Sequence, residues 1–313
     1  MKVISAALAI LSVVGFAMVA QVQAANAPVA AAAAVPAEKV DLLANKRVMI
    51  LGDSITENGT YVSYLEYFLN KAHSGKSFDI ISIGLSSETV SGLSEKGGSR
   101  PCVNERLQRS LDAIKPQLVI VCYGMNDGLY QPYSEANMKA FQDGMTKLVE
   151  TCQAAGAQVI LVTPPIFEGG AYDQVLGKFA EWEVAHPPKG TAAIVDLHAA
   201  MAAARAERQK ANPEFRFSGD NVHPGELGHI VMAQAILQRL AIPMSQGTAE
   251  ELQKSAQADP LFKLVCQHRG NRSSGWRNGI GQANERSAPN YGSLATVEVA
   301  AKALQSKIDV MRK

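Results

Sequence analysis

The sequence predicts an α/β fold, a three-layer α/β/α sandwich in which helices cover both faces of a central parallel five-stranded sheet. Two observations predict it. From residue 46 onward, short runs rich in Val and Ile alternate with longer segments of helical pattern, as they do in βαβ units. The short runs are apolar almost throughout, which is typical of strands that are covered on both faces.

Five segments have the length and composition of such strands. They are residues 47–51, 78–83, 118–122, 158–162 and 193–197. Right-handed crossovers between parallel strands restrict the topology to a flavodoxin-like arrangement. Ligand sites in such sheets open at the carboxyl ends of the strands, so we expect the functional residues directly after the strands.

Helical patterns fill the intervals between the strands. They cover about 60–73, 103–114, 134–155, 172–185, 199–210 and 225–240. Pro116, Gly156 and Pro187 mark points where the chain turns back into a strand.

The first 24 residues have the pattern of a signal peptide. Lys2 precedes an apolar run over 3–20, and the small residues Val22 and Ala24 suit cleavage after Ala24. The alternative is a membrane anchor, because the run approaches the length that spans a bilayer, but no basic stop-transfer cluster follows it. We therefore expect a periplasmic or secreted protein with no stable membrane insertion after cleavage.

The rest of the chain divides into three parts. Residues 25–45 form a linker rich in Ala and Pro, and 46–242 form the main domain. A C-terminal extension covers 243–313. Within it, 267–291 is rich in Arg, Asn, Gly and Ser, which predicts an irregular segment, and 294–311 carries the apolar stripe of a final helix packed on the main domain.

Composition narrows the classes of partner. The chain has 30 Lys and Arg against 29 Asp and Glu, and loss of Lys2 with the signal peptide leaves 29 against 29, a net charge of about zero. This balance argues against nucleic acid as a partner. Cys102, Cys122, Cys152 and Cys266 do not have the spacing of a zinc site, and their pairing stays open. We expect no metal or cofactor.

The first predicted strand leads into Gly52-Asp53-Ser54, which places a serine at the carboxyl edge of the sheet. A serine hydroxyl is a poor nucleophile unless a base lies within hydrogen-bond reach and a third group orients that base. Taken alone, the motif is explained as well by a turn or a helix cap. A catalytic role for Ser54 therefore depends on whether a base and an orienting group lie at the same edge of the sheet.

Three further residues have suitable chemistry at that edge. Asp220 and His223 precede the last main-domain helix and are close enough for one turn to present both. Asn126 follows the third strand, where its amide could donate a hydrogen bond to a developing oxyanion. Each signal alone is typical of turns, and metal ligation lacks a third ligand nearby. Together they predict a serine hydrolase site.

These residues lie in sequence blocks that resemble a known family. GDSIT at 52–56, GMND at 124–127 and DNVH at 220–223 are similar, in order and spacing, to the first, third and fifth blocks of the SGNH hydrolase superfamily, the GDSL-type esterases and lipases. The resemblance covers about 46–240 and implies the SGNH hydrolase fold for that domain.

The resemblance also implies roles for individual residues. It implies Ser54 as the nucleophile and first oxyanion N–H, Asn126 as a side-chain oxyanion donor, and Asp220 and His223 as the rest of a catalytic triad. The family's second block is less regular in this chain.

In that second block, Ser87 stands where the family commonly has a glycine that donates its backbone N–H to the oxyanion. Ser87 can supply this N–H provided that the turn does not need positive φ, which costs a residue with a Cβ about 1 kcal/mol or more. Gly84 is the competing candidate. We favour Ser87 from its position in the block.

Other residues near the motifs have weaker functional signals. Asp53 and Asp127 are expected to tie loops to backbone N–H groups rather than to transfer protons. Arg100 could reach a substrate, although a solvated arginine is the ordinary interpretation. Trp276 could fold over the mouth of the site against a sugar ring, but a tryptophan that anchors the extension to the core is the more common case.

The sequence therefore predicts an exported serine esterase that hydrolyses short-chain acyl esters, above all acetyl esters on carbohydrates. The alternatives are an exported thioesterase or lysophospholipase with the same chemistry, and a non-catalytic carbohydrate-binding protein on this fold. A long-chain lipase is disfavoured because no long apolar lid lies between Ser54 and Asn126.

Overall fold

The computed structural model describes residues 42–280 and 293–313. Its central sheet is entirely parallel, with the strand order β2-β1-β3-β4-β5 of a flavodoxin-like fold. The predicted fold class and five-stranded sheet are confirmed. The predicted signal peptide, most of the predicted linker and the end of the predicted irregular segment lie outside the described residues.

The strands and helices follow the alternation that the sequence predicts. The strands are β1 (Arg47–Gly52), β2 (Asp79–Ser82), β3 (Leu118–Cys122), β4 (Gln158–Val162) and β5 (Thr191–Val195). The helices are α1 (Ser54–Asn58), α2 (Thr60–Ala72), α3 (Val103–Ile114), α4 (Glu135–Ala154), α5 (Tyr172–Ala185), α6 (Leu197–Gln209), α7 (Glu226–Arg239), α8 (Ala249–Ala258), α9 (Pro260–Gly279) and α10 (Leu294–Met311).

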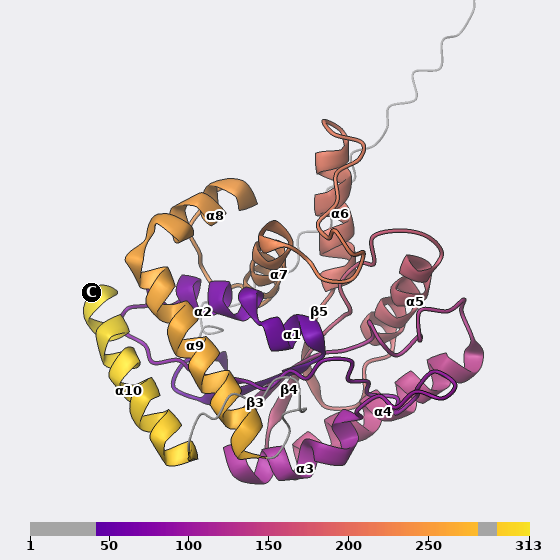
Figure 1. Cartoon of the computed structure of the whole chain (residues 1–313), viewed down its shortest axis with the longest axis horizontal. Helices are drawn as coiled ribbons and strands as arrows, with labels where there is room; N and C mark the ends of the chain where they lie inside the picture. The colour runs from indigo at the N-terminus through magenta and orange to yellow at the C-terminus, as the bar shows by residue number, and fades with distance from the viewer. Residues whose placement is uncertain (1–41, 281–292) are drawn as a thin grey trace, which may run out of the picture. The chain divides into compact units, whose positions relative to one another are not determined.

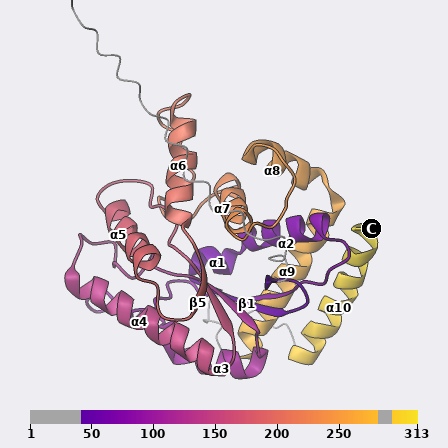
Figure 2. The same ribbon diagram turned by 180° about the vertical axis from the view of Figure 1, so that it is seen from behind.

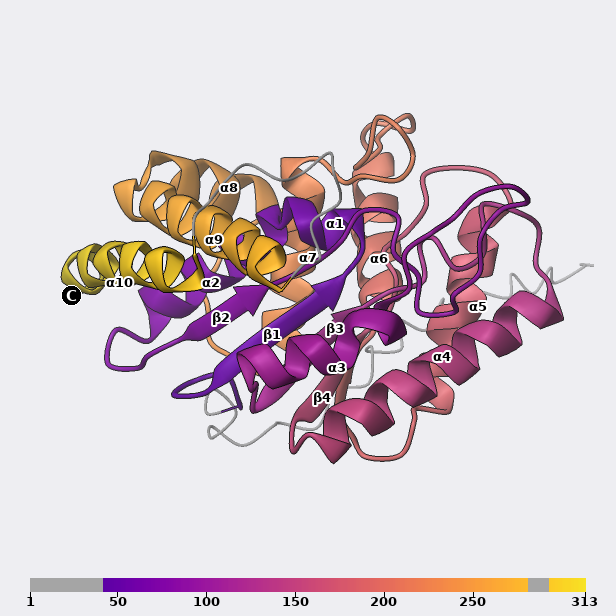
Figure 3. The same cartoon turned by 60° about the horizontal axis from the view of Figure 1, so that its bottom comes forward.

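Helices cover both faces of the sheet (Figure 3). On one face α2 packs against α7, and on the other α3 packs against α4. Phe141 of α4 stacks on Phe179 of α5 with the ring centroids 4.4 Å apart. Strand β3 is buried along its whole length, and β1 is buried from Val48 to Gly52. This explains the nearly continuous apolar runs from which the strands were predicted.

The boundary between β5 and α6 differs from the prediction. The strand predicted over 193–197 ends at Val195, because the carboxylate of Asp196 accepts a hydrogen bond from the N–H of Ala199 (3.1 Å) and caps α6. Leu197 is buried in the first turn of that helix. Its apolar side chain continues the core, which is why it resembled the end of a strand.

Helix α9 replaces the irregular structure that was predicted from residue 267, so that prediction was wrong over 267–279. Asp259 caps the helix by accepting a hydrogen bond from the N–H of Leu261 (2.9 Å), and Pro260 occupies the first turn. The Gly, Asn and Ser residues lower helix propensity, but tertiary packing of the buried face outweighs it. Trp276 lies in the buried apolar core, and its indole donates to Glu298 of α10 (2.6 Å), which joins the two helices of the extension.

The C-terminal extension packs against the edge of the sheet that β2 forms. Figures 1 and 2 show α10 beside α9, which contacts both α2 and the edge strand β2. The Arg272 side chain is largely buried, with ion pairs to Asp79 (2.6 Å) and Glu298 (2.9 Å), and it donates to the carbonyl of Ile80 (3.2 Å). The outer side of an edge strand has backbone groups without a partner strand, and Arg272 binds one of them, the Ile80 carbonyl. Arg272 therefore joins the extension to the sheet.

Two further properties bear on the sequence predictions. No helix within residues 42–280 and 293–313 is both long and apolar enough to cross a membrane. The four cysteines, whose pairing was left open, are all free thiols, and Cys122 and Cys152 are buried.

Replacement of Arg272 tests the attachment of the extension. Arg272→Met should lower the free energy of unfolding by roughly 2 kcal/mol, because it removes a largely buried guanidinium that pairs with two partly buried carboxylates, of which Asp79 keeps another cationic partner, Arg47. Chemical denaturation followed by circular dichroism measures the change. Arg239→Met is the matched control on the exposed side of α7 and should change stability by less than about 0.5 kcal/mol. Equal unfolding midpoints for the two variants would contradict this attachment.

Candidate active site

The ends of β1 and β3 bring the predicted site residues to one edge of the sheet. Gly52 at the end of β1 is in register with Cys122 at the end of β3. Ser54 begins α1 two residues after the end of β1, and Asn126 lies four residues after the end of β3. Because neighbouring parallel strands end at the same edge of the sheet, both residues lie at that edge.

Helix α1 lies directly on the strand ends because two glycines leave room for it. A Cβ on Gly52 would lie 2.1 Å from the Thr56 hydroxyl oxygen, and a Cβ on Gly84 would lie 2.4 Å from the Glu57 backbone nitrogen. Both separations are far shorter than any real contact. Any other residue at these positions would displace the helix that carries Ser54.

Ser54, His223 and Asp220 form a continuous chain of hydrogen bonds. The hydroxyl oxygen of Ser54 lies 2.8 Å from Nε2 of His223, and Nδ1 of the same ring lies 2.7 Å from Oδ2 of Asp220. The structure therefore brings together the three residues that the sequence suggested as nucleophile, base and orienting group. Their geometry is that of a serine whose proton can pass to an imidazole.

Asp220 is fixed by its own turn. Its Oδ1 accepts hydrogen bonds from the N–H groups of Val222 (2.9 Å) and His223 (2.8 Å) and from the Ser218 hydroxyl (2.8 Å). Burial acts to raise the pKa of Asp220, but these bonds and the imidazole contact outweigh it and hold the pKa well below its usual range. The carboxylate stays ionised and can stabilise a positive charge on His223.

The amide of Asn126 is buried and oriented by its neighbours. Its Nδ2 donates to the carbonyl of Glu88 (3.1 Å), while its Oδ1 accepts from Arg100 (3.1 Å) and from the Tyr130 hydroxyl (3.0 Å). A primary amide nitrogen carries two hydrogens, so one remains beyond the bond to Glu88. Asn126 can therefore present an N–H to a ligand oxygen.

The structure brings Ser87, rather than Gly84, beside Asn126. Arg100 bridges them, since its Nη1 contacts both the Ser87 carbonyl (3.4 Å) and the Asn126 side chain. Ser87 is exposed, whereas Gly84 is buried under α1. Ser87 has φ of 65°, so the expected condition that this turn avoids positive φ is not met, and the serine occupies the left-handed region at a cost of about 1 kcal/mol or more.

Arg100 is not a solvated arginine, so the ordinary interpretation of this residue was wrong. Its guanidinium pairs with Glu95 through Nε (2.9 Å to Oε2) and Nη2, and Nη1 reaches Asn126. It also lies over the Tyr130 ring, 5.7 Å from the centroid. No sequence pattern indicates this contact, because the composition of the glycine-rich loop before Arg100 does not determine the path of the backbone.

Asp53 and Asp127 tie loops to backbone groups, as expected. Asp53 caps α1 by accepting a hydrogen bond from the N–H of Ile55 (2.9 Å), and Asp127 accepts from the N–H groups of Val90 (2.9 Å) and Ser91 (2.8 Å). Burial raises the pKa of Asp53 to about 7, and the nearby Asp127 carboxylate adds to the rise. Asp53 therefore stabilises the turn between β1 and α1.

Glu57 is a residue near the site that sequence reasoning missed. It lies on α1, and its Oε2 accepts hydrogen bonds from both the N–H (2.6 Å) and the hydroxyl of Ser86. Arg277 of α9 lies 3.9 Å from the other oxygen. Glu57 thus joins the helix of Ser54 to the loop of Ser87. The only available signal was an acidic residue in the first turn of a short helix.

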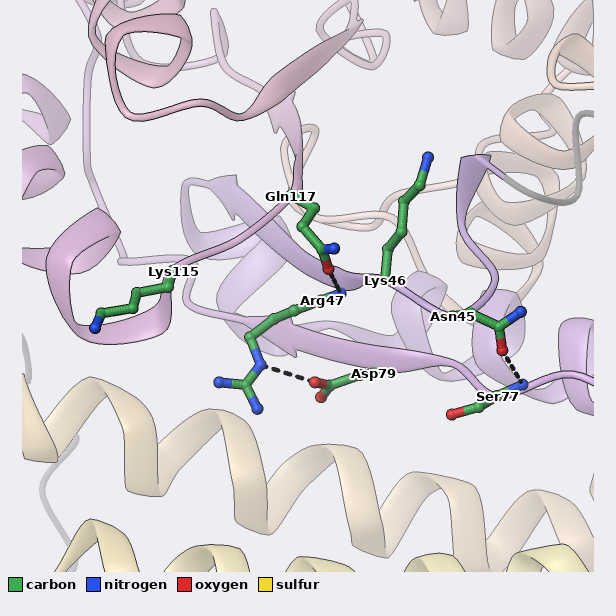
Figure 4. Close-up of a pocket in the computed structure, with 7 residues that line it drawn as sticks. All are labelled: Asn45, Lys46, Arg47, Ser77, Asp79, Lys115 and Gln117. Atoms are coloured by element: carbon green, nitrogen blue, oxygen red, sulfur yellow. Dashed lines mark hydrogen bonds and ion pairs between the residues drawn. The ribbon is translucent and has the colours of Figure 1, made fainter.

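A surface hollow of about 550 Å³ lies elsewhere (Figure 4). It includes Arg47, the first residue of β1, so it lies at the opposite end of that strand from Ser54. Lys46 and Lys115 point apart, and Arg47 is paired with Asp79 (2.7 Å). Its charged groups do not converge on one point. No group of three metal-ligating side chains occurs within the described ranges.

The sequence matches the model of a known family. Residues 50–231 match the model of the GDSL-like lipase/acylhydrolase family. An acetylxylan esterase of Geobacillus stearothermophilus is 23% identical over 220 residues, which cover 62% of this chain and 94% of that protein.

Solved structures share the fold. An alpha/beta hydrolase enzyme from the metagenome of Lake Arreo, Spain, has a TM-score of 0.50 and 22% identity, covering 65% of this chain and 98% of its own. A gut microbial diltiazem-metabolizing enzyme also has a TM-score of 0.50, with 18% identity over 64% of this chain and 47% of its own. The family match spans more than half of the sequence, and the chain therefore belongs to the GDSL-like lipase/acylhydrolase family of ester-hydrolysing enzymes.

Proposed function

We propose that this enzyme is an exported serine esterase that removes short acyl groups, chiefly acetyl, from carbohydrates. The observation that carries the catalytic part is the hydrogen-bond chain from Ser54 through His223 to Asp220. Export is supported by the predicted signal peptide over 1–24. The acetylated carbohydrate is supported by the acetylxylan esterase to which the chain is similar.

Acyl transfer begins at Ser54. His223 Nε2 takes the hydroxyl proton as the serine oxygen bonds to the acyl carbon, and Asp220 stabilises the imidazolium that forms. Collapse of the tetrahedral intermediate breaks the ester C–O bond, and His223 returns the proton to the departing alcohol. Water then attacks the acyl-enzyme with His223 again as base, which releases the carboxylic acid and restores Ser54.

The negative charge that develops on the tetrahedral oxygen is stabilised by hydrogen-bond donors that are already in position before the reaction. The backbone N–H groups of Ser54 and Ser87 and the second hydrogen of Asn126 Nδ2 are the candidates. Ser54 begins a helix, so its N–H has no partner within the helix. Glu57 and Arg100 hold the loop of Ser87 from its two sides. Fixed donors of this kind stabilise the transition state without reorganisation.

The surroundings of Asn126 favour a small acyl group. The connection from β2 to α3 is mostly polar where it is exposed, with Ser87, Lys96 and Ser99 among its exposed residues. Such a rim gives little apolar surface to a long acyl chain. The thioesterase and lysophospholipase alternatives use the same chemistry, so only substrates separate them. The hydrogen bonds that join Ser54, His223 and Asp220 argue against the non-catalytic alternative.

A substrate panel tests the proposed function. kcat/KM should fall by roughly tenfold or more from p-nitrophenyl acetate to p-nitrophenyl octanoate, because the polar rim beside Asn126 gives the added methylenes no apolar surface to bind. Acetylated xylooligosaccharides should be deacetylated, whereas an acyl-CoA thioester and a lysophospholipid should be poor substrates. Ser54→Ala should abolish turnover and melt close to the wild type, since it removes one partly exposed hydroxyl. Preference for octanoate, the thioester or the lysophospholipid would contradict the proposal.

The oxyanion donors can be tested one at a time. Asn126→Ala should lower kcat by roughly a hundredfold to a thousandfold with little change in KM, because the lost bond belongs mainly to the transition state. At position 87, lactic acid incorporated in place of the serine removes the N–H but keeps the turn, and Ser87→Ala is its matched control. The lactate variant should lose activity as Asn126→Ala does, while Ser87→Ala retains most of it.

Proline is unsuitable at this position, because it fixes φ near −65° where the turn needs 65°. If the lactate variant were as active as Ser87→Ala, the backbone donor would have to be another N–H, such as that of Gly84.

A further inference from the structure

The Asn126 amide has only one favourable orientation, and Arg100 is largely responsible for it. Two donors, Nη1 of Arg100 and the Tyr130 hydroxyl, point at Oδ1, and an acceptor, the Glu88 carbonyl, faces Nδ2. Rotation of the amide by 180° would place its NH₂ group against two donors and its oxygen against a carbonyl. The Glu88 carbonyl uses one Nδ2 hydrogen, so these contacts leave the other for the proposed oxyanion.

We propose that Arg100 is a positioning residue that orients and polarises the Asn126 amide during ester hydrolysis. This inference rests on the proposed function, in which Asn126 donates to the oxyanion. A hydrogen bond from a charged group to Oδ1 is stronger than one from a neutral group, and it draws electron density from the amide. The Nδ2 hydrogen then becomes a better donor to the negative oxygen of the transition state.

Arg100 is itself firmly held. Its side chain is 13% exposed, Nε and Nη2 pair with Glu95, and its backbone N–H donates to the Ser94 hydroxyl (2.8 Å). The remaining nitrogen, Nη1, contacts both Asn126 and the carbonyl of Ser87. One guanidinium thus links the side chain and the loop that carry two of the proposed oxyanion donors. With these contacts made, it is placed to act on Asn126 rather than to bind a substrate anion.

The Tyr130 hydroxyl, the second donor to Asn126 Oδ1, lies on a turn with an unfavourable backbone conformation. Leu129 and Tyr130 have φ of 56° and 55°, the left-handed region that is unfavourable for residues with a large side chain. Strain of this kind persists where surrounding contacts determine it, and it is frequent at functional sites. Here the strained turn places the Tyr130 hydroxyl 3.0 Å from Asn126 Oδ1.

A double-mutant cycle on kcat tests the inference with p-nitrophenyl acetate as substrate. Arg100→Met should lower kcat roughly tenfold to a hundredfold with little change in KM, the usual effect of losing a charged hydrogen bond that acts in the transition state. Arg100→Lys should recover part of the loss. In an Asn126→Ala background, Arg100→Met should change kcat far less than it does in the wild type, because its route through Asn126 is gone and only the long contact with the Ser87 carbonyl (3.4 Å) remains.

Two variants accompany the cycle. Tyr130→Phe removes the neutral donor, so it should cost less than Arg100→Met and should also have little effect in the Asn126→Ala background. If Arg100→Met does not fold, the same cycle can be measured with Tyr130→Phe and with Arg100→Lys. Arg208→Met is the matched control, since Arg208 pairs with Glu250 through Nε and Nη2 as Arg100 does with Glu95, but away from Asn126. It should leave kcat unchanged.

The outcomes separate this inference from the proposed function. Losses that multiply in the double mutants, or a rise in KM with unchanged kcat in Arg100→Met, would overturn the positioning role while the esterase assignment stands. A wild type without esterase activity, or an active Ser54→Ala variant, would instead remove the proposed function, and this inference with it.

Discussion

The close approach of α1 to the ends of β1 and β2 is the constraint on which the site depends. The two glycines beneath this helix lack the Cβ atoms that would collide with Thr56 and Glu57. At that separation, Ser54 reaches His223 on the loop before α7, and Glu57 reaches Ser86 on the loop after β2. A short helix resting on a buried sheet thus sets the relative positions of two loops that are distant in sequence.

The C-terminal extension supports the same arrangement from outside the region that the family match covers. Helix α9 packs on α2 and β2, places Arg277 near Glu57, and bonds Arg269 to Ser63 of α2 (3.0 Å). Arg272 closes the open edge of the sheet at Ile80. The extension is therefore a layer of the catalytic unit in this chain, and it stabilises the face on which α1 and α2 lie.

The sequence was most informative where short motifs coincide with strand ends. Apolar runs predicted all five strands, and the positions of the motifs predicted that Ser54, Asn126, Asp220 and His223 share one edge of the sheet. These predictions succeed because local patterns determine strands and because parallel strands share an edge.

The features that were missed depend on partners far along the chain. Helix α9 has an unfavourable composition and is stabilised by Asp79 and Glu298, which no local pattern reveals. The contact of Arg100 with Asn126 and the positive φ of Ser87 arise from the folded path of the connection between β2 and α3. The Glu57 contact with Ser86 likewise exists only after α1 lies on the sheet.

The central claim is that His223 activates Ser54 as the nucleophile, and labelling with a fluorophosphonate followed by peptide mass spectrometry tests it most directly. The account predicts one covalent adduct per chain, on the peptide that contains Ser54. Labelling should be abolished in Ser54→Ala and strongly slowed in His223→Ala, because an unactivated serine hydroxyl reacts poorly. An adduct on another residue, or labelling of folded His223→Ala at the wild-type rate, would contradict the account.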